Sequence, residues 1–113
     1  MERTEIPPGT LYMLILKSLA RGAMHGYGIA QSIQQATEDV LQVEEGSLYP
    51  ALQRMLAKGW VTAEWKQSEN NRRARYYRLT PAGRKQLTSE VRDFERVMGA
   101  IGRVVGAKYG MAE

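Results

Sequence analysis

Residues 47–80 read SLYPALQRMLAKGWVTAEWKQSENNRRARYYRLT, and this stretch predicts a helix followed by a β-hairpin. We expect the helix to begin near Ser47, whose hydroxyl suits an N-cap, with Pro50 at the third helical position. It ends at Lys58-Gly59. The apolar side of this helix carries Leu48, Leu52, Met55 and Leu56. The opposite side carries Pro50, Gln53, Arg54 and Ala57, with Ser47 and Tyr49 on its flanks.

Two strands rich in aromatic and β-branched residues follow, over residues 60–66 and 75–80. The polar segment between them reads QSENNRRA, so the strands form a hairpin. Side chains alternate between the two faces of a strand. We therefore expect one of Tyr76 and Tyr77 to pack inward and the other to face out.

The net charge of +4 is concentrated at this hairpin. Residues 61–85 hold seven basic and two acidic side chains, whereas the rest of the chain has a slight acidic excess. A concentrated basic patch attracts polyanions, because neutralised phosphates release condensed counterions. On charge alone, a solvated surface loop is the alternative.

Two shorter helices are predicted before Ser47. The first covers residues 10–20, with Thr10 as its cap, and the second runs from Gly26 or Tyr27 to Thr37. Each has one apolar face, formed by Leu11, Leu14, Ile15 and Leu19 in the first helix and by Ile29, Ile33 and Ala36 in the second. A short extended piece is expected at residues 41–43. His25, Gly26 and Gly28 are assigned structural roles at the start of the second helix.

A long last helix is predicted from Thr80-Pro81 to about Lys108, with threonine as N-cap and proline at the first helical position. Apolar residues recur along it at spacings of four and three: Leu87, Val91, Phe94, Met98, Ile101 and Val105. Such a heptad seam packs against another helix. We therefore expect residues 81–113 to join two chains in a homodimer. Residues 1–80 are then the expected DNA-binding part.

The predicted fold class is mainly α with a small β-hairpin. Three compact helices, a basic hairpin and a long helix are the order of a winged helix-turn-helix protein with a C-terminal dimerisation helix. In this arrangement the third helix offers its outer face to a DNA groove and the hairpin forms the wing.

Other functional classes lack support in the sequence. There is no cysteine and only one histidine, His25, so neither a metal site nor a cofactor is expected. No nucleophile stands beside a base, and Glu44-Glu45 is expected in a solvated turn, so we predict no enzyme. No apolar run could span a membrane, and the first residues do not resemble a secretory signal. The expected location is the cytoplasm.

Three blocks of residues resemble the PadR family of bacterial transcription regulators. They are His25-Gly26-Tyr27-Gly28-Ile29, Gly46-Ser47-Leu48-Tyr49-Pro50-Ala51-Leu52 and the stretch RARYYRLT from Arg73 to Thr80, followed by Pro81-Ala82-Gly83. The resemblance implies a dimer that binds a pseudo-palindromic operator in double-stranded DNA and usually represses. With a single long helix after the wing, the chain resembles the short subfamily. Some short members bind flat aromatic compounds at the dimer interface, which implies a small aromatic effector.

The residues expected to contact DNA lie on the third helix and the wing: Ser47, Tyr49, Gln53, Arg54, Lys66, Arg72, Arg73 and Arg75. Gln53 is the expected base reader, because an amide can make bidentate bonds to adenine, while Arg54 suits guanine or the backbone. The wing residues suit phosphates or the minor groove.

Alternatives stay open for several of these residues. Tyr49 is either a DNA contact or mainly a packing residue, and the wing arginines are either DNA contacts or a solubilising surface. Phe94 is either a packing residue of the seam or a contact for an aromatic effector. The competing hypothesis for the whole chain is a winged-helix protein-interaction module without specific DNA binding.

Overall fold

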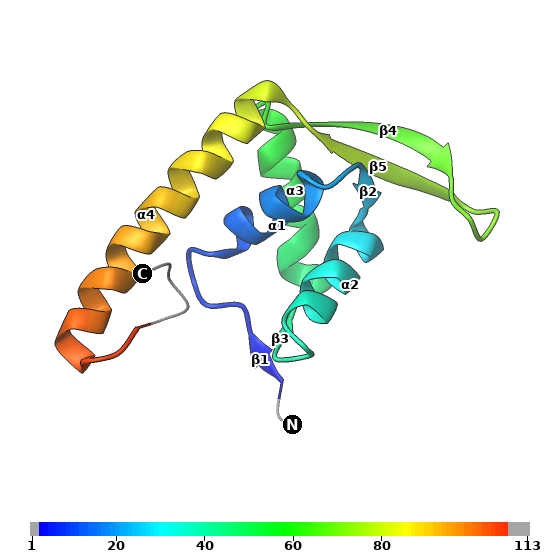
Figure 1. The fold of residues 1–113 in the computed structure, drawn as a ribbon. Coiled ribbons are helices and arrows are strands. Elements are labelled where there is room, and N and C mark those ends of the chain that lie inside the picture. Colours follow the sequence, from blue (N-terminus) through cyan, green and yellow to red (C-terminus); the bar gives the residue numbers. More distant parts are fainter. Residues whose placement is uncertain (1–2, 109–113) are drawn as a thin grey trace.

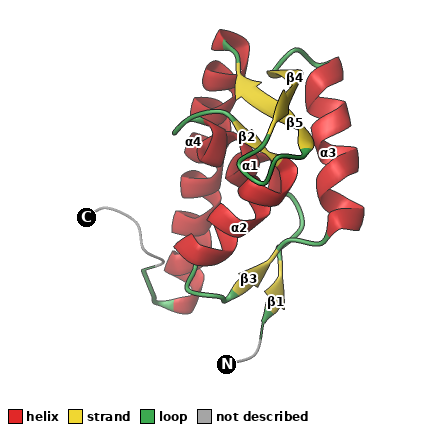
Figure 2. Ribbon diagram, turned by 90° about the vertical axis from the view of Figure 1, so that its right-hand side faces the viewer, coloured by secondary structure: helices red, strands yellow, loops and turns green. Residues whose placement is uncertain are grey.

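A computed structural model describes residues 3–108 (Figure 1). Three helices form a body, from which a β-hairpin and a long helix extend on different sides (Figures 1 and 2). In chain order the elements are β1 (Thr4–Glu5), α1 (Leu11–Leu19), β2 (Met24–His25), α2 (Gly26–Ala36), β3 (Leu41–Gln42), α3 (Glu45–Ala57), β4 (Val61–Gln67), β5 (Arg73–Leu79) and α4 (Pro81–Val105).

This order confirms the predicted winged helix-turn-helix fold with a long C-terminal helix. The expected strands at 60–66 and 75–80 lie at 61–67 and 73–79, and the short extended piece near residue 41 is β3. Two strands were missed. β1 pairs in parallel with β3, and β2 adds a third strand to the hairpin by pairing with β5. Both are two residues long, which is too short to leave a periodic signal.

The core lies between the three helices of the body and the base of the hairpin. Its buried apolar residues come from α1, α2, α3, β4 and β5: Ile15, Leu16, Leu19, Ile29, Ile33, Leu48, Ala51, Leu52, Met55, Val61, Tyr77 and Leu79. Tyr77 is buried and Tyr76 is only partly covered, which confirms the expected alternation along β5.

The first two helices begin in different ways. Thr10 precedes α1 as expected, but its hydroxyl donates to the carbonyl of Pro7 instead of capping the helix. His25 precedes α2, and its Nδ1 accepts a hydrogen bond from the amide of Gly28 at 2.9 Å. The structural role expected for His25 is therefore a helix N-cap.

Helix α3 begins earlier than predicted. Glu44 is its N-cap residue and Glu45 its first helical residue, so the expectations of a Ser47 cap and of a solvated turn at Glu44-Glu45 are wrong. Glu45 suits this place, because the positive end of the helix dipole favours a carboxylate. Pro50 consequently occupies the sixth helical position, where it leaves the carbonyl of Gly46 without an amide partner four residues on. Gly46 is exposed, so water can reach that carbonyl.

The hairpin has a regular antiparallel register. Val61 lies opposite Leu79, Ala63 opposite Tyr77, and Trp65 opposite Arg75. Because faces alternate, these pairs share the face that is buried at the base of the hairpin and emerges into solvent farther out. Beyond β4, Asn71 has a φ of 62°. Its backbone amide closes the turn by donating a hydrogen bond to the carbonyl of Ser68.

Helix α4 begins as predicted and ends three residues before the expected Lys108. The hydroxyl of Thr80 accepts from the amide of Gly83 and donates to the carbonyl of Gly59, so one side chain caps α4 and ties it to the end of α3. The helix stops at Val105, because Gly106 adopts a left-handed conformation with a φ of 78°. None of the helices in residues 3–108 has the length and apolar character of a membrane span.

Gly83 allows α4 to approach the body closely. A Cβ atom at this position would lie 2.1 Å from the carbonyl oxygen of Trp60. We expect Gly83→Ala to lower the free energy of unfolding by about 1–3 kcal/mol, as overpacking does. Gly46→Ala is the matched control, since nothing lies within 4 Å of its added Cβ, and alanine is the better helix former. Urea denaturation measures both, and equal stability of the two variants would contradict the close contact.

Candidate nucleic-acid interface

Helix α3 presents a continuous exposed face to solvent. Leu48, Leu52 and Met55 are buried as predicted, and Leu56 is partly buried. The opposite side is exposed over its whole length, and its middle is formed by small residues: Gly46, Pro50 and Ala57. A surface can approach the helix backbone closely along this strip. Polar side chains flank the strip on both sides.

Tyr49 is both packed and exposed. Its ring lies against Gly26, where an added Cβ would be 2.7 Å from the ring carbon and the hydroxyl oxygen. The side chain is nevertheless 42% exposed. Burial of part of the phenol, followed by the nearby Glu45 and Tyr77, raises the pKa of Tyr49 above its ordinary value. The hydroxyl therefore stays protonated as a hydrogen-bond donor throughout the physiological range.

Gln53 links α3 to the wing. Nη1 of Arg75 lies 3.5 Å from Oε1 of Gln53, a long hydrogen bond between β5 and α3. The guanidinium carbon of Arg75 also lies 5.9 Å from the ring centroid of Tyr77, which is buried in the core. The two predicted site residues are thus brought together, and the amide of Gln53 is oriented towards the wing.

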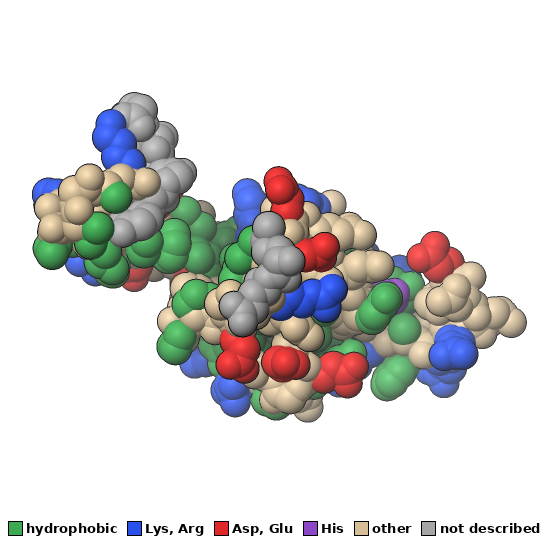
Figure 3. All heavy atoms as spheres, turned by 90° about the horizontal axis from the view of Figure 1, so that it is seen from below, with side chains coloured by type: hydrophobic (Ala, Val, Ile, Leu, Met, Phe, Trp, Pro, Cys, Tyr) green, Lys and Arg blue, Asp and Glu red, His purple; other side chains and the backbone are tan. Residues whose placement is uncertain are grey.

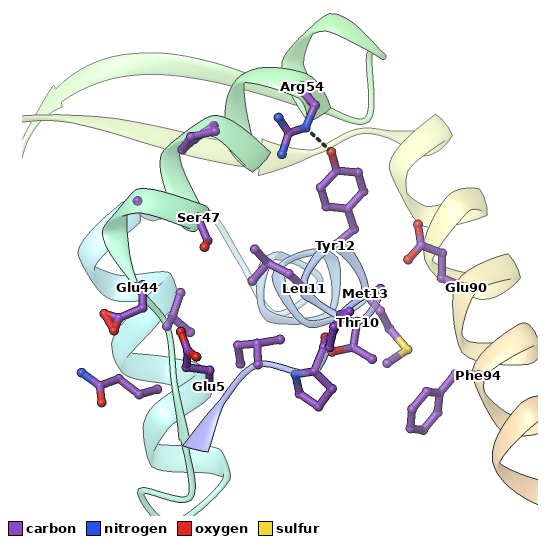
Figure 4. Close-up of a pocket in the computed structure, with 18 of the residues that line it drawn as sticks. Glu5, Thr10, Leu11, Tyr12, Met13, Glu44, Ser47, Arg54, Glu90 and Phe94 are labelled. Carbon is purple, nitrogen blue, oxygen red and sulfur yellow. Dashed lines mark hydrogen bonds between the residues drawn. The ribbon is translucent and has the colours of Figure 1, made fainter. Parts of the chain in front are cut away.

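Arg54 points to the other side of α3. Its Nε donates to the hydroxyl of Tyr12 on α1, as the dashed line in Figure 4 shows. The guanidinium carbon is 6.0 Å from the centroid of the Tyr12 ring. Ser47 lies on the same side of the helix, and both residues line a groove that α3 forms with residues 5–13 and α4. The four residues predicted on α3 are therefore divided, with Tyr49 and Gln53 on the wing side and Ser47 and Arg54 on the groove side.

The wing carries its cations on both faces. Arg73 and Arg75 share the face that looks towards α3, whereas Lys66 lies on the other face, 5.1 Å from the ring centroid of Tyr76. Arg72 is exposed at the end of the turn. On the α3 side the guanidinium of Arg73 lies 5.4 Å from the ring centroid of Trp65. Trp65 was not among the predicted site residues, although alternation along β4 from the apolar Val61 could have identified its face.

A groove of about 1070 Å³ lies on the far side of α3 from the wing. It is bounded by the segment from Glu5 to Met13, the N-terminal half of α3, and α4. Figure 4 shows Glu90 of α4 facing Tyr12, and Phe94 of α4 lying near Met13. Four carboxylates line the groove against one guanidinium: Glu5, Glu44, Glu90 and Asp93.

The predicted seam of α4 is divided into two parts. Leu87 packs against the core of its own chain, and Val91, Phe94 and Met98 are half-buried. Ile101 and Val105 are exposed by 42% and 62%. Two further valines, Val97 and Val104, are also exposed, and hydrophobic side chains gather on the projecting end of α4 at the left of Figure 3. We call Val97, Ile101, Val104 and Val105 the distal apolar strip.

Within residues 3–108, no three histidine, cysteine, aspartate or glutamate side chains are placed to hold a metal ion together.

Comparisons with known proteins agree with this architecture. The chain is 35% identical over 83 residues to the transcriptional regulator Rv3488 of Mycobacterium tuberculosis, covering 74% of each chain. Among solved structures, a transcriptional regulator from Clostridium thermocellum superimposes with a TM-score of 0.77 at 28% identity, covering 84% of this chain and 92% of that one. A PadR family transcription regulator from Clostridium difficile gives 0.73 at 26% identity, covering 86% and 99%.

The family model of these regulators matches residues 15–89, from the middle of α1 through the wing into α4. This range contains all three blocks on which the resemblance rested, together with both faces of α3. The chain belongs to the transcriptional regulator PadR-like family.

Proposed function

We propose that this chain is a sequence-specific regulator that binds double-stranded DNA as a homodimer and represses transcription from a pseudo-palindromic operator. The observation that carries the proposal is the contact between Arg75 and Gln53. It joins the exposed face of α3 to the basic wing, so that one surface has both a helix for a major groove and cations for the adjacent backbone.

Helix α3 would enter the major groove with its strip of small residues facing the bases. Gln53 is the proposed base reader, because it borders this strip and its amide can bond an adenine edge in two places. Tyr49 would use its protonated hydroxyl on a phosphate. Ser47 and Arg54 flank the strip on the other side. They would contact the opposite wall of the DNA major groove once the hydrogen bond between Arg54 and Tyr12 is broken.

The wing would supply most of the sequence-independent affinity. Arg72, Arg73 and Arg75, with Lys66 across the hairpin, are placed for phosphates and the minor groove next to α3. Residues 1–80 would thus act as the DNA-binding part. Such a protein acts where the DNA is, in the cytoplasm of a bacterial cell.

Residues 81–113 would hold two copies together. The distal apolar strip of α4 is exposed in a single chain, and α4 is about 37 Å long, long enough to extend beyond the body (Figure 1). Packing of the strip against the same strip of a second copy would remove it from water and set a fixed distance between two α3 helices. A repressor role follows from the resemblance to the family.

The groove is the proposed binding site of the expected aromatic effector. Tyr12 and Phe94 are aromatic residues that line the groove, and Arg54 connects it to α3. A molecule that displaced the bond between Tyr12 and Arg54 would act directly on the helix proposed to read DNA.

The proposed function is tested by gel shift with DNA from upstream of the gene, competed with unrelated DNA at moderate salt. We expect a specific complex. Arg72→Ala together with Arg73→Ala should reduce the slope of log K against log salt concentration by about 2, because each lost phosphate contact removes about 0.9.

Arg96→Ala together with Arg103→Ala is the matched control, since it removes the same charge from exposed positions of α4. It should leave the slope nearly unchanged. If no upstream fragment competes better than unrelated DNA, the proposal of a specific regulator fails. If the wing variant binds DNA like the wild type, a protein-interaction module becomes the better account.

The dimer is tested by light scattering at micromolar concentration. Ile101→Glu places a carboxylate in the distal apolar strip, so we expect a monomer with unchanged helicity and weaker binding to a full operator. Thr88→Glu places the same carboxylate on the opposite side of α4, at an exposed position, and should remain a dimer. A wild-type chain that is monomeric and still binds a full operator would contradict the proposed assembly.

A further inference from the structure

Trp65 stands out on the wing because it is a large apolar side chain with little cover. Its side chain is 58% exposed. The register puts it on the same face as Val61 and Tyr77, which are buried in the core. The face is thus apolar at the base of the hairpin and continues into solvent at Trp65, where the hairpin extends past the body (Figure 1).

Trp65 lies between two arginines. Arg75 is directly opposite it on β5, and the guanidinium of Arg73 lies 5.4 Å from the centroid of its ring. Arg75 in turn reaches Gln53 on α3. An unbroken row therefore runs from the exposed face of α3 to the tip of the wing, in the order Gln53, Arg75, Trp65, Arg73.

No acidic residue interrupts this row. Glu64 is paired with Tyr76 on the opposite face of the hairpin, and Glu69 lies in the turn. A flat apolar ring flanked by guanidinium groups suits the wall of a DNA groove, because deoxyribose offers carbon atoms between charged phosphates. Stacking on the ring also limits the rotamers of Arg73, so that less freedom is lost when its guanidinium meets DNA.

We propose that Trp65 is a DNA-contacting residue: its indole lies against the deoxyribose wall of the minor groove and holds Arg73 directed into that groove. This inference rests on the proposed function. It adds an apolar contact of the wing with DNA to the charge that the arginines supply. It predicts that affinity depends on the ring as well as on the arginines.

Fluorescence tests the contact directly, because the chain has only two tryptophans. Trp60→Phe leaves Trp65 as the single reporter, and its emission should move to shorter wavelength when the operator duplex binds, since the indole leaves water. Trp65→Phe leaves Trp60, whose ring packs edge-on against Tyr12 at 5.8 Å and should report little change.

Affinity for the same duplex gives a second measurement. Trp65→Ala should weaken binding about tenfold, and Trp65→Phe should recover most of the loss. In a double-mutant cycle, Arg73→Ala should cost less in the Trp65→Ala background than in the wild type, because the stacked pair acts as a unit. Thr62→Ala, at an exposed position on the other face of β4, is the matched control and should bind normally.

The two failures are distinguishable. A wild-type chain without any preference for an operator contradicts the proposed function itself. Specific binding by the wild type, with unchanged Trp65 emission and full affinity of Trp65→Ala, overturns only the role of Trp65. Circular dichroism of Trp65→Ala should show that the fold is retained, as expected for an exposed strand position.

Discussion

Burial of the hairpin base against the body is the constraint on which the remaining surface depends. Val61, Tyr77 and Leu79 are inserted into the core beside α1 and α3, which fixes the direction of both strands. Since strand faces alternate, the outer residues of the same face must then look towards α3. The meeting of Arg75 with Gln53 is a consequence of this anchoring, and so is the exposed row on the wing. A hairpin without a buried base would carry the same charges with no fixed relation to the helix.

The two sides of α3 have different environments. On the wing side Tyr49 rests on Gly26 of α2 and Gln53 meets Arg75 of β5. On the groove side Arg54 is bonded to Tyr12 across from α4. Helix α3 is therefore in physical contact with both the wing and the groove beside the proposed dimerisation helix. A molecule bound in the groove would therefore contact the helix proposed to read DNA directly.

The sequence predicted the order and type of the main elements because α1 and α3 have apolar residues at helical spacing and the strands are rich in aromatic and β-branched residues, and the family blocks agreed with this order. It misplaced the start of α3, since the hydroxyl of Ser47 and the place of Pro50 suggested a beginning at Ser47, whereas the helix begins at Glu45. It treated the apolar residues of α4 as one seam, although Leu87 serves the core of its own chain. It also did not show which side of α3 meets the wing and which meets α1, because those contacts join residues 22 and 42 positions apart in the chain.

In the proposed complex, α3 and the wing of each chain read adjacent grooves of the DNA as one unit, twice per dimer. Hydroxyl-radical footprinting of the specific complex tests it most directly. We expect two protected half-sites related by a two-fold axis, with centres about 10 base pairs or a multiple of that apart, each flanked by a protected minor-groove segment for the wing. Protection of a single segment without a flank, or uniform protection along the duplex, would contradict it.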